Sequence, residues 1–168
     1  MWFIESRRLR LVEFQLSDAA FIVQLLNEPT FIENIADKGV RTIDDAHAYL
    51  SDGPIASYKK NGFGLWKILL RGTDEVIGMC GLIQREILDD VDVGYALSPA
   101  YVGQGYAQEA VSAVLKYAKQ YLLLKRMVAI VNPKNRRSIT LLNKLGFSYE
   151  RMLILSETDE VMLFGTPI

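Results

Sequence analysis

The sequence predicts a single α/β domain over residues 1–168, built on a mixed, mostly antiparallel, seven-stranded sheet with helices on both faces. Half of the residues are apolar, which is enough to fill one core. Three apolar runs, residues 65–70, 76–83 and 91–97, follow one another with short polar breaks, as in a β-meander. A long amphipathic helix then separates residues 91–97 from the apolar run 127–131. A strand–helix–strand crossover of this kind makes its two strands parallel.

Apolar periodicity places one strand and two helices ahead of the meander. Ser17 or Asp18 can cap the first helix, because a side-chain oxygen accepts the free backbone N–H groups of a first turn. Pro29 and the pair Gly53-Pro54 are expected to end the two helices, since proline cannot continue a helix. The expected elements are, in order, a strand at about 9–14, a helix from 18 to near 29, and a helix from Thr42 to near 53.

The second half of the chain completes the order βααβββαβαββ. The polar residues 71–75 predict the turn of a hairpin between the first two meander strands. After the crossover helix and its strand, residues 135–145 predict a helix for which Gly146 is the C-terminal cap. Two closing strands are expected near 147–155 and 161–164, on either side of the polar turn 156–160.

The bulk composition excludes several classes of protein. A net charge of −1 argues against nucleic acid or an anionic membrane as the main partner. Cys80 is the one cysteine, so no internal disulfide is possible, and its apolar neighbours indicate a buried small hydrophobe rather than a nucleophile. One His and one Cys do not suggest a metal site. Because no apolar stretch nears membrane-spanning length, the cytoplasm is the expected location. The sequence leaves open whether the protein is a monomer or a homodimer.

The most informative stretch is residues 97–110, which join a strand to the long helix through a turn with two glycines and no side-chain cap. Free N–H groups at such a helix start carry the positive end of the helix dipole and suit an anion. Gly103 and Gly105 let the backbone approach a phosphate without a Cβ in the way. The turn is therefore interpreted as a pyrophosphate cradle; the alternative is a tight turn with no ligand.

Two familiar phosphate-binding patterns do not fit this loop. A dinucleotide fingerprint needs a third small residue where this chain has Gln108, and an acid about twenty residues on, where it has Lys125 and Arg126. A Walker loop needs a Gly-Lys-Ser/Thr triplet, which the sequence lacks. What remains is a coenzyme with an exposed pyrophosphate.

Four stretches, taken together in this order, resemble those of the GNAT superfamily of N-acyltransferases, which use acetyl-coenzyme A. More narrowly, the chain resembles the branch that contains the ribosomal-protein N-terminal-alanine acetyltransferases. The joint spacing is more specific than any one piece. The stretches are residues 8–11 with 18–19, residues 91–97, residues 103–110, and residues 132–138 continuing to 144–147.

The resemblance implies a GNAT-like fold in which the strands at 91–97 and 127–131 splay apart and hold the pantetheine arm of acetyl-CoA. A main-chain N–H near residues 95–97 would also stabilise the oxyanion formed during acyl transfer. The implied coenzyme-binding residues are Tyr95, Ala96, Leu97, Gly103, Gln104, Gly105, Tyr106, Ala107, Asn135 and Ser138.

The implied reaction is direct attack of an amine on the thioester. Asp92 matches the acid of the family's acid-aliphatic-Gly-Tyr strand and is the candidate base; the alternative is an exposed strand carboxylate. Ser138 is the candidate for facing the departing thiolate, unless it only packs in its helix. Asn135 either bonds the pantetheine or caps that helix. Leu142 departs from the family, because many members have a general-acid tyrosine there.

The leading hypothesis is an acetyl-CoA-dependent N-acetyltransferase of a primary amine: a protein N-terminus, an amino acid or another small amine. The missing tyrosine at Leu142 leaves a catalytically silent acyl-CoA-binding or regulatory module as the alternative. Arg136 and Arg137 either meet the 3′-phosphate of the coenzyme or are simply solvated. The acceptor is expected to contact the segments with the least readable pattern, residues 27–40 and 156–160.

Overall fold

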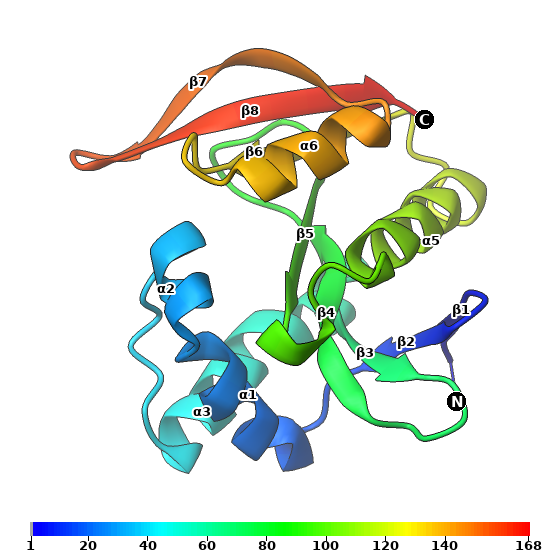
Figure 1. The fold of residues 1–168 in the computed structure, drawn as a ribbon, viewed down its shortest axis with the longest axis vertical. Helices are drawn as coiled ribbons and strands as arrows, with labels where there is room; N and C mark the ends of the chain where they lie inside the picture. The colour runs from blue at the N-terminus through cyan, green and yellow to red at the C-terminus, as the bar shows by residue number, and fades with distance from the viewer. Residues whose placement is uncertain (1) are drawn as a thin grey trace.

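The computed structural model describes residues 2–168, which form one mixed sheet with the strand order β1-β2-β3-β4-β5-β6-β8-β7 (Figure 1). Neighbouring strands in this order are antiparallel except β5 and β6, which are parallel as expected from the crossover helix. The strands are β1 Ile4–Glu5, β2 Leu9–Glu13, β3 Leu65–Leu70, β4 Val76–Ile83, β5 Asp92–Leu97, β6 Arg126–Val131, β7 Ser148–Ser156 and β8 Asp159–Pro167.

The expected fold class is confirmed, but the expected count of seven strands is wrong, because β1 adds an eighth at the edge of the sheet. This strand pairs Ile4 with Leu11 and Glu5 with Arg10 of β2. Two residues are too short to give a period-2 pattern in sequence. Only the partner strand defines β1.

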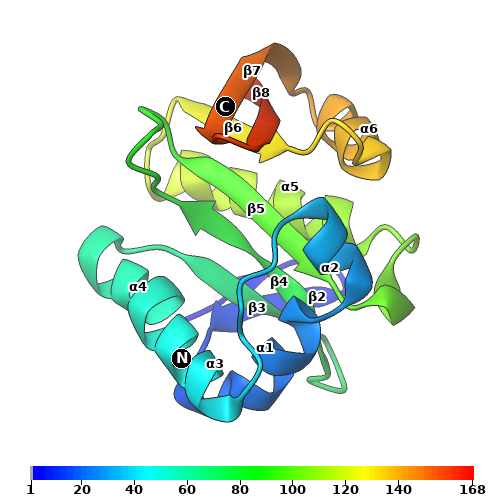
Figure 2. The ribbon, with the colours of Figure 1, turned by 90° about the vertical axis from the view of Figure 1, so that its left-hand side faces the viewer.

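Helices cover both faces of the sheet (Figure 2). On one face, α5 packs Ala110, Val111, Val114 and Ala118 against a core that includes Leu11, Trp66 and Ile77. On the other face, α1 and α3 bury a second cluster around Met79. The helices are α1 Ala19–Leu26, α2 Pro29–Asn34, α3 Ile43–Leu50, α4 Ala56–Asn61, α5 Tyr106–Gln120 and α6 Arg136–Lys144.

Two of these helices, α2 and α4, were not expected, and a proline explains each. Pro29 ends the pattern of α1, but it stands at the first position of α2, where its missing N–H costs no hydrogen bond. Pro54 lies inside a π-helical turn, Ser51–Ile55, that joins α3 to α4. Such a turn widens the helix at a point where the regular hydrogen-bond ladder is interrupted. The chain therefore stays helical to Asn61.

The expected cap Gly146 is confirmed, and the expected cap at Ser17 or Asp18 is wrong. At the start of α3, the first residue of the expected second helix, Thr42, is its N-cap and accepts a hydrogen bond from Asp45 N (3.1 Å). Gly146, with φ +91°, ends α6 while Phe147 N donates to Leu142 O, which is a Schellman arrangement. At the start of α1, however, no side-chain cap forms. The carboxylate of Asp18 accepts instead from Gln15 N (2.8 Å), one turn earlier, and from Lys67 Nζ on β3 (3.0 Å).

The strands β5 and β6 separate after one residue pair, Asp92 with Val128, so the sheet opens between them. Figure 1 shows β5 continuing away from β6 toward the start of α5, while β6, β8 and β7 lie with α6 above the opening. No helix within residues 2–168 has the length and apolar character to cross a bilayer.

Candidate active site

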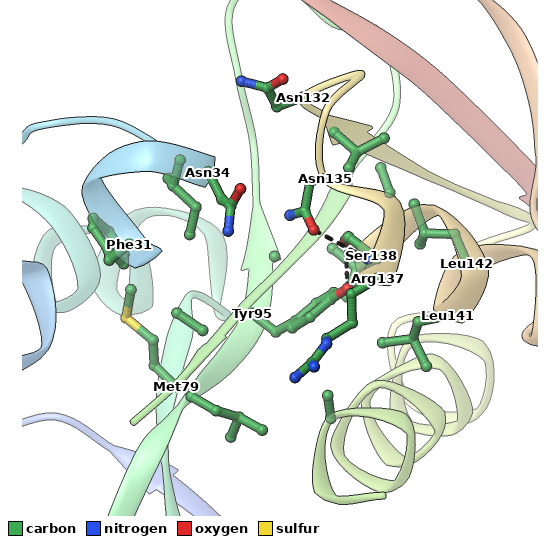
Figure 3. Close-up of a pocket in the computed structure, with 18 of the residues that line it drawn as sticks. Phe31, Asn34, Met79, Tyr95, Asn132, Asn135, Arg137, Ser138, Leu141 and Leu142 are labelled. Carbon is green, nitrogen blue, oxygen red and sulfur yellow. Dashed lines mark hydrogen bonds between the residues drawn. The ribbon is translucent and has the colours of Figure 1, made fainter. Parts of the chain in front are cut away.

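A cavity of about 950 Å³ occupies the opening between β5 and β6. Figure 3 shows its two sides, with α2 on one and α6 on the other, and with Tyr95 of β5 between them. Its wall combines apolar side chains with a few polar ones. Ten of the site residues assigned from sequence line it: Asp92, Tyr95, Ala96, Leu97, Gly103, Gly105, Tyr106, Ala107, Asn135 and Ser138.

The N-terminus of α5 opens into this cavity without a side-chain cap. Gly105 is the N-cap residue, with φ +82°, and the first helical hydrogen bond runs from Glu109 N to Gly105 O (3.1 Å). The N–H groups of Tyr106, Ala107 and Gln108 precede that bond, so they are the free donors of the first turn. A Cβ on Gly103, at φ +81°, would meet no atom within 4 Å. The loop therefore leaves room for an anion beside several backbone donors.

The outer side of this helix start is held by Arg8 and Glu109. The Glu109 carboxylate accepts from Ser6 Oγ (2.5 Å), from Arg8 N (2.8 Å) and from Arg8 Nε (2.8 Å). Arg8 also donates to Gln104 O (3.1 Å) and lies over the Tyr106 ring, with Cζ 4.3 Å from the ring centroid. Burial alone would raise the pKa of Glu109, but the hydrogen bonds from Ser6 and Arg8 outweigh it, and the pKa is lowered. The loop between β1 and β2 thereby fixes the loop that precedes α5.

The edge of β5 that faces the opening has free backbone groups. Ser98 N donates to Ile77 O on the β4 side, whereas Val91 O accepts from Val128 N on the β6 side. Backbone groups alternate between the two edges along a strand, so the N–H and C=O of Tyr95 and Leu97 point toward β6. Since β6 has already diverged, these groups face the cavity.

Side chains from β5 and α6 meet across the cavity. The hydroxyls of Tyr95 and Ser138 are hydrogen-bonded, and Ser138 N donates to Asn135 Oδ1 (3.2 Å) (Figure 3). Asn135 is thus the N-cap of α6, one of the two roles left open for it. Burial raises the pKa of Tyr95 to about 12, although the hydrogen bond with Ser138 opposes the shift. Tyr95 therefore stays a neutral hydroxyl that can donate or accept.

Asp92 is 1% exposed, so the alternative of an exposed strand carboxylate is wrong. It stands at the first residue of β5, where β5 and β6 still pair, and it lines the cavity. Its carboxylate forms an ion pair with Arg85, from the segment between β4 and β5. Burial raises the pKa of Asp92, while the guanidinium of Arg85 offsets part of that effect.

The remaining candidates take different positions. Gln104 lies outside the cavity wall, and its side-chain amide donates to Ala100 O (2.9 Å). Arg136 and Arg137 both line the cavity from the first turn of α6. Leu142 is 1% exposed and belongs to the main core cluster as well as to the wall. Within residues 2–168, no three His, Cys, Asp or Glu side chains gather as metal ligands do.

The segment 27–40, expected to contact the acceptor, does line the side of the cavity that faces α6. Phe31 and Asn34 of α2 lie there (Figure 3), and Lys38 and Arg85 join the wall from irregular segments. No residue of the other expected segment, 156–160, lines the cavity. Sequence reasoning named none of these four residues, because the segments carry no clear periodic signal. An arginine seven residues before Asp92 was the one available hint of an ion pair.

Comparisons with known proteins agree with this architecture. The uncharacterized N-acetyltransferase p20 of Bacillus licheniformis is 35% identical over 153 residues, which cover 88% of this chain and 83% of that protein. The ribosomal protein uS5-alanine N-acetyltransferase of Escherichia coli (strain K12) is 29% identical over 115 residues, covering 64% of this chain and 59% of that protein.

A solved structure and a protein-family model also match this chain. The structure of RimL, a ribosomal L7/L12 α-N-protein acetyltransferase in complex with coenzyme A, superposes with a TM-score of 0.84 at 18% identity, over 99% of this chain and 98% of that chain. A model of the acetyltransferase (GNAT) domain matches residues 8–148, which is most of the chain. The protein therefore belongs to the GNAT family of acetyltransferases.

Proposed function

We propose that this acetyltransferase moves an acetyl group from acetyl-CoA to a primary amine, with Asp92 as the base and Ser138 facing the coenzyme sulfur. The observation that carries the proposal is the continuous wall from the uncapped start of α5, along the free edge of β5, to the Tyr95–Ser138 pair. A protein N-terminus, an amino acid and another small amine all fit this description. The relatives named for ribosomal-protein acetylation favour the first.

The residues of the wall suit each part of the coenzyme. The backbone donors at Tyr106 and Ala107 suit the pyrophosphate, because a helix start concentrates N–H groups and positive potential. The free N–H and C=O groups of Tyr95 and Leu97 suit the amides of the pantetheine arm, which then acts as a short strand. Arg136 and Arg137, which line the wall from the first turn of α6, are the cations that suit the 3′-phosphate.

Asp92 is suited to take the proton of the attacking amine. Acetyl-CoA, when bound, supplies the acyl thioester, and the amine must be neutral to attack it. An α-amino group with a pKa near 8 costs about 1 kcal/mol to deprotonate at pH 7, whereas a lysine amine near 10.4 costs about 4–5 kcal/mol. Burial raises the pKa of Asp92 toward that of the amine, which makes it a better proton acceptor than an exposed aspartate. An α-amino acceptor therefore fits this site best.

The hydroxyl pair of Tyr95 and Ser138 is suited to stabilise the departing thiolate. Tyr95 is neutral at physiological pH, so it can donate to Ser138 Oγ while the Ser138 hydroxyl proton points to the sulfur. Thiols have a pKa near 8.5, so the demand on this donor is small. Leu142 carries no hydroxyl, so in this proposal the pair supplies the proton donor that the family resemblance implies for a tyrosine at that position.

Acetylation of an amine and peptide library, followed by mass spectrometry, tests the proposal. Asp92→Asn and Ser138→Ala are each expected to lower kcat about 100-fold or more, with Kd for coenzyme A within about threefold of wild type. Ser112→Ala, on an exposed position of α5 outside the cavity, is the matched control. Coenzyme binding with no product from any amine would refute transfer, and an unchanged kcat in either variant would remove that residue.

A further inference from the structure

We propose that the acceptor amine also carries an anionic group, a carboxylate, which Lys38 and Arg85 bind at the α2 side of the cavity. This inference rests on the proposed function and names the class of acceptor. A free amino acid supplies such a carboxylate at its own α-carbon. A peptide supplies it when an acidic residue follows its N-terminal residue.

The α2 side is the part of the cavity that the coenzyme leaves open. The donors that suit the coenzyme lie on α5, on the free edge of β5 and on α6. Across from them, Phe31 and Asn34 of α2 face the opening (Figure 3), and Lys38 follows in the segment after α2. Asp92, at the start of β5, lines the same cavity and forms an ion pair with Arg85. An amine bound at Asp92 therefore lies beside Arg85, in a cavity whose wall also includes Lys38.

The charges of the wall favour an anion there. Among the described residues that line the cavity, Asp92 is the only carboxylate, and the ion pair with Arg85 already offsets its charge. Three of the cations, Arg136, Arg137 and Lys144, belong to α6 on the coenzyme side. Lys38 and the terminal Nη groups of Arg85 remain for the acceptor, because Asp92 pairs with Arg85 through Nε.

Lys38 has no ion-pair partner within residues 2–168. The neighbouring carboxylate, Asp37, accepts hydrogen bonds from Arg41 Nη2 at both of its oxygens (2.9 and 2.7 Å). Desolvation lowers the pKa of Lys38, and the positive charge of Arg85 lowers it further. Lys38 lines the cavity and is exposed to solvent, so a ligand can reach it. An anion between Lys38 and Arg85 would relieve their repulsion.

This arrangement discriminates between classes of amine. A polyamine brings further positive charge toward Lys38 and Arg85, which raises the cost of binding. An amine with a neighbouring carboxylate gains charge-assisted hydrogen bonds, while its amino group still reaches Asp92. The acceptor class is therefore defined by two groups: an amine and a carboxylate a few bonds away.

Steady-state kinetics with matched acceptor pairs tests the inference. Each α-amino acid is compared with its own carboxamide, and each Ala-Asp peptide with its Ala-Asn counterpart, all with acetyl-CoA as donor. The carboxylate member of at least one pair is expected to have a kcat/KM about tenfold or more above its amide. Which of the two series shows the preference distinguishes a free amino acid from an acidic peptide.

The variant Lys38→Met is expected to raise KM about tenfold for the carboxylate acceptor while changing the amide and acetyl-CoA less than about twofold. Lys119→Met, on an exposed position of α5 away from the cavity, is the matched control and keeps the wild-type preference. Equal efficiency for acids and amides, or a Lys38 effect on KM for acetyl-CoA alone, overturns this inference only. Coenzyme binding without acetylation of any amine overturns the proposed function, and this inference with it.

Discussion

The start of α5 allows a sharp test of the coenzyme cradle, through the variant Gly105→Ala. Gly105 has φ +82° and ψ 3°, a left-handed conformation that costs an alanine about 1–2 kcal/mol. A Cβ there would also lie 3.3 Å from Arg8 Nη2, so the Arg8 side chain must shift by a few tenths of an ångström. Relief of this strain moves the backbone donors of the first helical turn. A helix start contributes about 1–2 kcal/mol to binding an anion, so the coenzyme affinity should fall about fivefold to thirtyfold.

Gly72→Ala is the matched control. Gly72 also has a positive φ, +98°, lies in the turn between β3 and β4, and has open space around an added Cβ. Denaturant unfolding should show a loss of about 1–2 kcal/mol in both variants. Calorimetric titration with coenzyme A should show weaker binding only for Gly105→Ala. Equal affinities in the two variants would refute the assignment of the cradle to the start of α5.

Two further variants test charged groups through the pH dependence of the free energy of unfolding. Burial raises the native pKa of Asp92, so its contribution to the free energy of unfolding is greatest below the unfolded pKa of about 4 and is lost as pH rises. In denaturant unfolding, the stability of Asp92→Asn relative to wild type should therefore increase from pH 4 to pH 7. A decrease in this relative stability over that interval would contradict the sign. The pKa of Glu109 is lowered, so its contribution is present at neutral pH and is lost in acid. Glu109→Gln should cost about 1–3 kcal/mol at pH 7 and progressively less below pH 4; a pH-independent loss would show that packing, not charge, is responsible.

The sequence predicts those parts of the fold that have a local cause. The bounds of β3 and β4 follow from two apolar runs and a polar turn, and the parallel pairing of β5 and β6 follows from the crossover helix. The elements that were missed depend on a partner or an exception. Strand β1 exists because β2 offers an edge, and Pro54 stays inside a helix because a π-turn accommodates it.

The candidate site divides in the same way. The start of α5 and the Asn135 cap are local patterns, since each is encoded in a few consecutive residues. The Arg85–Asp92 ion pair, the Tyr95–Ser138 hydrogen bond and the position of Lys38 join segments that are distant in sequence or irregular in structure. Periodicity does not encode such contacts, because they arise from the tertiary fold. For the acceptor side of the cavity, the sequence therefore indicated the segment 27–40 but not the individual residues that line the wall.

The divergence of β5 from β6 after a single residue pair leaves the molecule with an incomplete ladder in the middle of its sheet. The amide protons of Tyr95 and Leu97 lack a strand partner there, so they exchange with deuterium faster than those of the paired edge of β5. A pantetheine arm bound along this edge would supply the missing hydrogen-bond partners and slow that exchange. Coenzyme binding can thus be followed from two amide groups, without any measurement of turnover.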